Sequence, residues 1–151
     1  MAKRRDSQKS GLAGEFFVAA ELLKRDFQVV LTMGNAKSVD IIVQRDDTSL
    51  PVTVQVKTLR SSNCYLIGVR NVVPSQIYVF VLLRKVAQPV EYFIVSGQEM
   101  LDRRFEIWGQ NGGDGDFAGI TMGRIRPFQD RWDVFDNMLN KASSNKAIDG
   151  D

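Results

Sequence analysis

Four residues in the first half of the chain have side chains suited to metal-assisted hydrolysis: Glu15, Asp40, Gln55 and Lys57. Carboxylate and amide oxygens are the hard ligands that Mg²⁺ takes, and one or two carboxylates suffice because the ion keeps several waters. A lysine beside such an ion can polarise an attacking water and offset charge that develops on phosphoryl oxygens. The residue types therefore suit cleavage of a phosphodiester bond, provided that the fold brings them together.

Three of the four residues fall in a predicted β-hairpin. Residues 38–43 and 52–57 have the composition of strands, and the segment between them is polar and rich in turn-forming residues. With the turn centred near its middle, Asp40 lies opposite the stretch from Gln55 to Lys57. Apolar and polar residues alternate in the second strand, so Gln55 and Lys57 share one face within reach of Asp40.

Glu15 falls in a predicted helix over residues 11–27, on the side that should face the protein. A carboxylate turned toward a core costs several kcal/mol unless a lysine or a metal ion compensates it. Gly11 and Gly14, at the start of this helix, would let another backbone approach closely. The apolar arc that brackets Glu15 is predicted to contain Leu12, Phe16, Val18, Ala19, Ala20, Leu22 and Leu23.

The pattern Gly-x-x-Gly-Glu at residues 11–15, then Asp40 in a strand, then Gln-x-Lys at residues 55–57 resembles the PD-(D/E)XK nuclease superfamily. It is similar to the Gln-x-Lys members, including Mrr-type restriction endonucleases, and to Holliday-junction-resolvase-like proteins with a helical Glu. Two positions depart from the family pattern: Val39 replaces the name-giving Pro, and Gln55 replaces the more common Asp or Glu. The second departure removes one negative charge from the site.

The resemblance implies an α/β fold with a restriction-endonuclease-like core, in which flanking helices and an N-terminal helix carrying Glu15 surround a central mixed β-sheet. It also implies a Mg²⁺-dependent DNA endonuclease that leaves a 5′ phosphate, with Mn²⁺ able to substitute. Asp40 supplies a metal-binding carboxylate, and the Gln55 amide and the Val56 backbone carbonyl supply neutral oxygens. Glu15 can restore the charge missing at Gln55, and Lys57 is the residue that assists the attacking water.

Basic residues near these motifs are candidates for contact with a phosphate backbone. Lys3, Arg4, Arg5 and Lys9 precede the helix that carries Glu15, and Arg60 follows Lys57. For each of them, a solvated surface charge is an equally good interpretation. The arginines in the last third of the chain cannot be placed on one face.

Each site residue also has an interpretation without chemistry. Asp40 alone is consistent with a strand-end residue, Lys57 alone with a solvated face, and Glu15 with a structural salt bridge to Lys57. Two independent arguments, hairpin register and helical phase, favour a joint site. A non-catalytic nucleic-acid- or protein-binding module on the same fold is the alternative to the nuclease, and fold alone does not decide between them.

Composition excludes several classes of function. The chain has no histidine, which removes Ser-His-Asp and Cys-His catalysis, HNH-type nucleases and the usual Cys/His zinc sites. Its single cysteine, Cys64, allows no intramolecular disulfide and suits a reducing compartment. No apolar run has transmembrane length, so we expect a cytoplasmic protein that binds no membrane. The resemblance implies a nucleic-acid partner, DNA before RNA. A homodimer is left open.

The 151 residues predict one nuclease-like domain at 11–140, between a disordered basic arm at 1–10 and a disordered tail at 141–151. No internal repeat or long linker divides it. The remaining predicted elements are strands at 27–32, 65–69, 76–83, 90–95 and 120–125, a helix from a capping box at Ser96 to about Phe105, and a final helix from Pro127 with a core stripe of Phe128, Trp132, Phe135 and Leu139.

Overall fold

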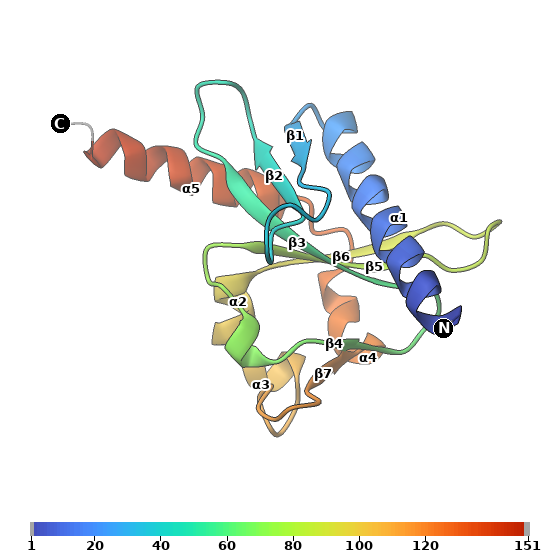
Figure 1. The fold of residues 1–151 in the computed structure, drawn as a ribbon. Coiled ribbons are helices and arrows are strands. Elements are labelled where there is room, and N and C mark those ends of the chain that lie inside the picture. Colours follow the sequence, from blue (N-terminus) through green and yellow to red (C-terminus); the bar gives the residue numbers. More distant parts are fainter. Residues whose placement is uncertain (1, 150–151) are drawn as a thin grey trace.

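The computed structural model describes residues 2–149, and the side chains of residues 7–144 (Figure 1). No helix in this part of the chain combines the length and the apolarity needed to cross a membrane. The elements in chain order are α1 (Ala2–Lys24), β1 (Gln28–Leu31), β2 (Ile41–Gln44), β3 (Val52–Leu59), β4 (Cys64–Leu66), η1 (Val69–Asn71), β5 (Ile77–Leu82), β6 (Glu91–Ser96), α2 (Gly97–Asp102), α3 (Arg104–Ile107), β7 (Gly119–Thr121), α4 (Met122–Ile125), η2 (Arg126–Phe128) and α5 (Asp133–Asp149).

Five strands form a mixed sheet in the order β1-β2-β3-β5-β6. β3 and β5 run parallel, whereas the other neighbours are antiparallel. β4 and β7 form a separate antiparallel pair beside the main sheet (Figure 1). The predicted α/β class with a central mixed sheet is therefore confirmed. Residues 65–69, predicted as one short strand, contribute only their first part to β4.

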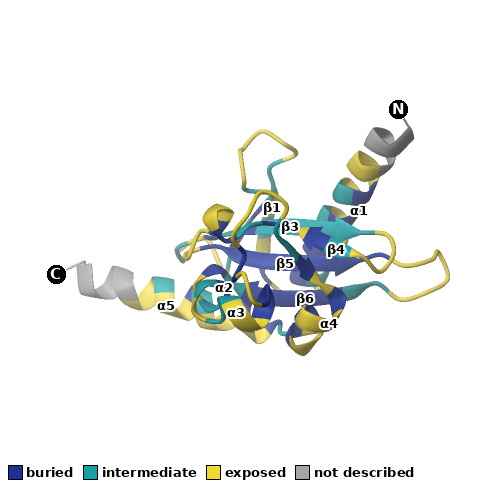
Figure 2. Cartoon of the chain, turned by 90° about the horizontal axis from the view of Figure 1, so that it is seen from below, coloured by how far each residue is buried: buried dark blue, intermediate teal, exposed yellow. Residues whose placement is uncertain are grey.

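An apolar cluster covers each face of the sheet. All six residues of β5 are buried, because this strand has neighbours on both sides and packing on both faces. Val79 and Val81 belong to the first cluster, beneath α1 and α5. Tyr78, Phe80 and Leu82 belong to the second, which β4, β7 and the short helices α2 to α4 enclose (Figure 2). The alternation along β5 thus divides the core into two halves.

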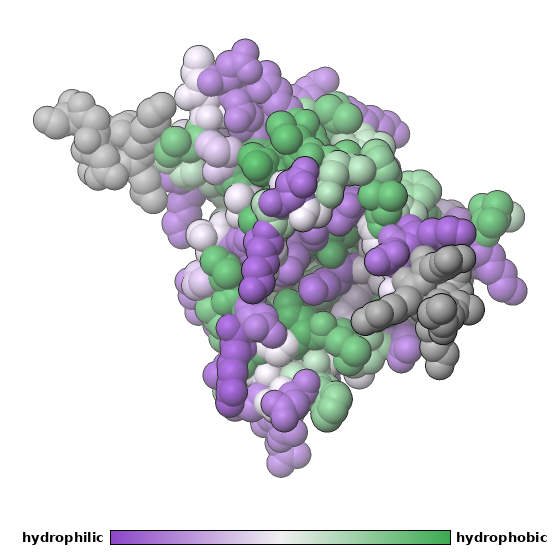
Figure 3. Space-filling view, viewed as in Figure 1, coloured by the Kyte–Doolittle hydropathy of each residue, from purple (hydrophilic) through white to green (hydrophobic). Residues whose placement is uncertain are grey.

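α1 contacts the sheet through a narrower stripe than its sequence predicts. Gly14, Val18 and Leu22 are buried against the sheet. A close helix–sheet approach needs a small residue at its centre, so the bulky side chains flank the contact instead of filling it. Figure 3 shows apolar atoms at the surface over α1 and β1. Four side chains of the predicted inward arc are exposed instead: Ala20, and Leu12, Phe16 and Leu23 at 41%, 49% and 55%.

The chain after β7 differs from the prediction. The predicted strand at 120–125 ends at Thr121, and α4 follows it. The final helix begins at Asp133, whereas Pro127 lies in η2. Asp130, with φ of 54° in the left-handed region, turns the chain between η2 and α5. Phe128 consequently packs in the second cluster, while the rest of the predicted stripe packs in the first.

Both ends of the described chain are helical where the sequence predicts disorder. Residues 2–10 belong to α1, and residues 141–149 belong to α5. Neither segment contains proline or glycine, and Lys, Arg, Gln and Ala favour continuation of a helix that has already formed. The boundaries of the predicted domain at residues 11 and 140 therefore fall inside helices.

Candidate functional site

Asp40 lies at the open end of the β2–β3 hairpin, one residue before β2. The register pairs Ile41 with Val54, so Asp40 is level with Gln55, within the stretch that the sequence predicts. Its backbone N–H donates a 2.9 Å hydrogen bond to the Val54 carbonyl. Its carboxylate Oδ2 accepts a 2.8 Å hydrogen bond from the backbone N–H of Val56, beyond the end of β2. Asp40 is thereby fixed to β3 by both its backbone and its side chain.

Glu15 reaches Asp40 because α1 packs closely on β3 at Gly14. A Cβ atom at Gly14 would lie 1.9 Å from Thr58 Oγ1 and 2.9 Å from Thr58 Cβ, so this approach requires glycine. The next residue, Glu15, is consequently partly buried between helix and sheet. The predicted close approach is confirmed at Gly14. At Gly11 an added Cβ would meet nothing within 4 Å, so that glycine is not needed for the packing.

The carboxyl groups of Glu15 and Asp40 interact directly. Burial, the charge of Asp40 and a hydrogen bond between the two carboxyl groups together raise the pKa of Glu15 to about 7. Neither carboxylate forms an ion pair within residues 7–144. Glu15 therefore keeps its proton up to near neutral pH, because two ionised carboxylates this close would repel each other. A divalent cation would relieve the same repulsion by replacing the proton.

Gln55 and Lys57 lie on the face of β3 that is turned away from α1. Gln55 is level with Tyr78 of β5, and Lys57 is level with Phe80. Both aromatic side chains belong to the second cluster, which confirms that Gln55 and Lys57 share a face. Lys57 forms no ion pair in the described part of the chain, so the structural Glu15–Lys57 salt bridge is not formed.

The oxygen donors near Asp40 fit a lightly ligated metal ion. No group of three or more His, Cys, Asp or Glu side chains that could hold a metal occurs among the described residues. The donors that remain are the carboxylates of Glu15 and Asp40 and the neutral oxygens of Gln55 and Val56. This set matches Mg²⁺, which needs few protein ligands when waters and a substrate phosphate complete its octahedron. A zinc-type site is not supported.

Two of the predicted nucleic-acid-binding side chains can be placed. Lys9 is exposed on α1. Arg60 directly follows β3, and its Nε donates a 2.7 Å hydrogen bond to the hydroxyl of Ser10, which is 5% exposed. Arg60 thus ties the end of β3 to α1 while its guanidinium remains at the surface. The side chains of three other predicted residues lie outside the described ones: Lys3, Arg4 and Arg5.

Sequence reasoning missed the residue that holds Asp40 from the side of β1. The backbone N–H of Thr32 donates a 3.0 Å hydrogen bond to the Asp40 carbonyl. The Thr32 hydroxyl donates a 2.7 Å hydrogen bond to the carbonyl of Val39. This contact closes a loop that begins with positive φ angles at Met33 and Gly34. No periodic pattern marks Thr32, because its role depends on how the loop returns.

Comparison of the chain with protein-family models, curated proteins and solved structures finds no match. The case for function therefore rests on the chemistry of the residues and on the geometry described above.

Proposed function

We propose that this protein is a Mg²⁺-dependent nuclease that hydrolyses phosphodiester bonds, specifically a DNA endonuclease with a restriction-endonuclease-like core. The observation that carries the proposal is the contact between Glu15 and Asp40, which helps to raise the pKa of Glu15 to about 7. Protein cores avoid such carboxylate pairs, and pKa values perturbed in this way are concentrated at functional sites. The order of the motifs supports the same family.

The metal would be held by Asp40 and Glu15, with the Gln55 amide oxygen and the Val56 carbonyl as neutral donors. When bound, Mg²⁺ supplies Lewis acidity toward a phosphate oxygen. Glu15 gives up its proton when the ion binds, so metal affinity should increase with pH. Asp40 also has a structural role, since its carboxylate accepts a hydrogen bond from the Val56 backbone N–H and so joins the end of the hairpin to β3.

Lys57 is the residue of the chain that we assign to the attacking water. Its ammonium group has no ion-pair partner among the described residues, so it can hydrogen-bond water and a phosphoryl oxygen. Water attacks phosphorus and releases a proton to solvent, the bond to the 3′ oxygen breaks, the 3′ oxygen takes up a proton as a hydroxyl, and the phosphate stays on the 5′ oxygen. β2 begins only at Ile41, which pairs with Val54, so β3 has no β2 residue beside it beyond that pair. Lys57 on one face of β3 and Glu15 on the other can both reach a substrate along this open edge.

The decisive experiment measures cleavage of plasmid, linear and branched DNA with Mg²⁺ or Mn²⁺, against an EDTA control. Lys57→Ala and Asp40→Ala should each lower the rate by at least about 10²-fold, because each removes a group that acts in the transition state. DNA affinity should remain largely intact, since one side chain is a small part of a multi-phosphate contact. Purified wild-type protein that cuts no DNA or RNA form, or Asp40→Ala that cuts at the wild-type rate, would refute the proposal.

The second candidate is a non-catalytic binding module on the same fold. The placement of Lys57 on the opposite face of β3 from α1 favours it, and so does the neutral Gln55. In that case Asp40 serves only to bind Val56, and Glu15 keeps its proton at neutral pH. Substitutions at Asp40 and Lys57 would then change stability or partner affinity, and there would be no metal-dependent cleavage for them to abolish.

A further inference from the structure

A basic cavity lies at the end of the sheet to which β3 and β5 point. Its volume is about 430 Å³, and Leu82 forms part of its wall. Ser61 and Ser62 add hydroxyl groups to its lining, and no carboxylate is among the lining residues. Its cationic lining residues come from three separate segments of the chain: Arg60, Arg84, Lys85 and Arg126.

The topology of the sheet gathers these cations. β3 and β5 are parallel, so the residues that follow them emerge at the same edge. The backbone N–H of Arg84 donates a 2.9 Å hydrogen bond to the Arg60 carbonyl, which holds the two segments together. Arg84 also has φ of 66°, where the chain turns away from β5 toward the loop. η2 adds Arg126, which pairs with Glu91 of β6.

The cavity keeps a positive charge after its ion pairs are counted. The carboxylate oxygens of Glu91 lie 3.2 Å from Arg84 Nη1 and 3.5 Å from Arg126 Nη1, so one negative charge pairs with two guanidinium groups. The bond from Arg60 Nε to Ser10 leaves the terminal nitrogens of Arg60 for another partner. Arginine forks and serine hydroxyls are the groups that bind phosphate oxygens. The lining of the cavity therefore suits an anion with several oxygens.

This cavity continues the face of β3 that carries Lys57. Lys57 and Leu59 are two residues apart on one strand, so they share a face and lie roughly 7 Å apart. Leu59 is level with Leu82, which lines the cavity. Arg60, which lines the cavity, is three residues beyond Lys57, roughly 10 Å along the strand. At about 3.4 Å of axial rise per nucleotide this corresponds to about three nucleotides, so a DNA strand with one phosphate at Lys57 would bring a nearby phosphate to the cavity.

We propose that this cavity binds a backbone phosphate of the DNA strand whose cleavage site lies at Lys57. The inference rests on the proposed function for the identity of the ligand as DNA. Backbone phosphates position a duplex without reading its sequence, so the cavity should act on DNA of any sequence.

The test measures the affinity of a short DNA duplex by fluorescence anisotropy in EDTA, where no cleavage occurs, over a range of salt concentrations. The double variant Arg84→Gln/Lys85→Gln should bind at least about tenfold more weakly. The slope of log K against log salt should become shallower by about 0.9 for each phosphate that the variant no longer neutralises. Arg126→Gln, on a different element, should act in the same direction.

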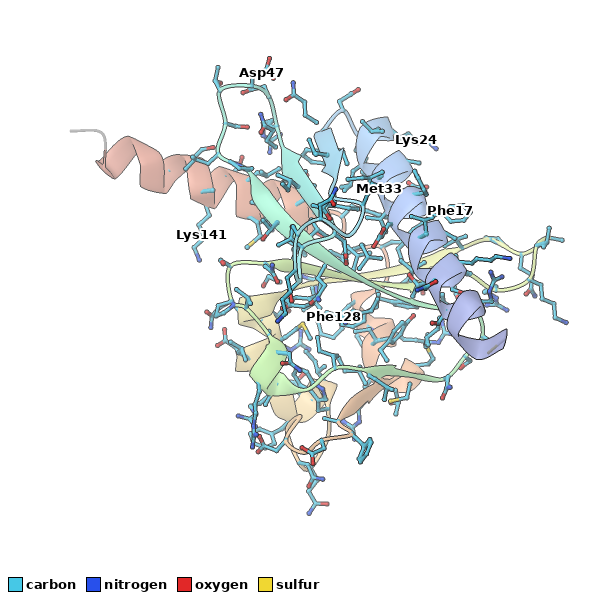
Figure 4. All side chains as sticks on the ribbon, in the orientation of Figure 1. Phe17, Lys24, Met33, Asp47, Phe128 and Lys141 are labelled. Carbon is cyan, nitrogen blue, oxygen red and sulfur yellow. The ribbon has the colours of Figure 1, made fainter. Side chains whose placement is uncertain are left out.

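Lys24→Gln/Lys141→Gln is the matched control, because it removes the same charge from exposed sites. Figure 4 shows Lys24 at the end of α1 and Lys141 on α5, away from the loop between β5 and β6. The control should leave the salt slope unchanged. Equal losses of affinity in the control and the test variant, or a wild type that does not bind DNA, would overturn the inference.

Parallel cleavage assays separate this inference from the proposed function. A wild type that binds DNA through these residues but does not cut it would confirm that the cavity binds a DNA phosphate, and would remove the nuclease together with the cleavage site at Lys57. A wild type that cuts DNA, together with an Arg84→Gln/Lys85→Gln variant that binds DNA as tightly as the control, would refute the inference about the cavity and leave the nuclease proposal standing.

Discussion

Two regions of β3 collect opposite charges by different routes: an acidic end near Gln55, at the middle of the strand, and a basic end beyond Leu59. Near Gln55 the carboxylates of Glu15 and Asp40 meet, where one comes from a helix and the other from a hairpin. Beyond Leu59 the cations follow directly from strand direction, since Arg60 and the residues after β5 emerge at one edge. The acidic end therefore depends on how α1 docks, and the basic end on sheet topology.

This difference makes the two ends separable. Displacement of α1 should dismantle the acidic end first, because Gly14 sets the distance between helix and β3. The basic end should lose only the bond that joins Arg60 to Ser10. A variant that perturbs one end should therefore leave the other largely intact.

Gly14→Ala should have the largest effect. The new Cβ would lie 1.9 Å from Thr58 Oγ1, so α1 must shift, at a cost of about 3 kcal/mol in the free energy of unfolding. The stabilisation that Mg²⁺ gives should be lost as well, because Glu15 moves away from Asp40. Urea unfolding with and without Mg²⁺ measures both effects, and duplex binding in EDTA should fall only slightly.

Gly11→Ala is the control for this variant. An added Cβ there meets nothing within 4 Å, and alanine favours the helix by about 1 kcal/mol over glycine, so stability should increase. Thr58→Ala should partly rescue Gly14→Ala, because the Thr58 hydroxyl is buried and forms no hydrogen bond within the described residues. Equal stabilities for Gly14→Ala and the wild type would contradict the close approach.

The pH dependence of stability should report on Glu15. Its pKa is about 7 in the folded protein and about 4.5 when unfolded, so folding favours the protonated form. The native state binds more protons between these values, and the contribution of Glu15 to stability is lost as the pH rises through 7. Relative to Glu15→Gln, the wild type should therefore become less stable from about pH 5 to pH 8.

Saturating Mg²⁺ should reverse this trend for the wild type, because the ion binds ionised Glu15 and its stabilising effect grows with pH. Thermal unfolding of both proteins at several pH values measures the difference. Parallel curves for wild type and Glu15→Gln, with and without the ion, would show that the carboxyl groups are not coupled.

Ser10→Ala should have the smallest effect, and we expect it at the basic end. It removes the acceptor of the Arg60 hydrogen bond, which contributes on the order of 1 kcal/mol to the placement of that side chain. Duplex affinity in EDTA should fall by about two- to fivefold, while the shift of the unfolding temperature by Mg²⁺ should stay at its wild-type value. A loss of the Mg²⁺ effect would mean that Ser10 supports α1 rather than Arg60.

Local patterns in the sequence predicted the parts that depend on neighbouring residues. Strand alternation placed Gln55 and Lys57 on one face, and the hairpin register put Asp40 level with Gln55. The predicted N-cap at Ser96 is confirmed as well, since the Ser96 hydroxyl accepts a 3.1 Å hydrogen bond from the backbone N–H of Glu99. These features repeat every two to four residues, so they can be read from spacing alone.

The sequence by itself therefore determined the hairpin, the shared face of Gln55 and Lys57, and the inward side of Glu15, but not that this shared face is turned away from α1. Only the tertiary structure decided that Leu12 and Phe16 stay exposed, that Phe128 packs on the other face from the residues of α5, and that Arg84 joins Arg60. Hydrophobicity says that a side chain gains from burial, but not which surface will cover it. That choice depends on packing between segments distant in the chain, and at α1 one glycine contact settles it.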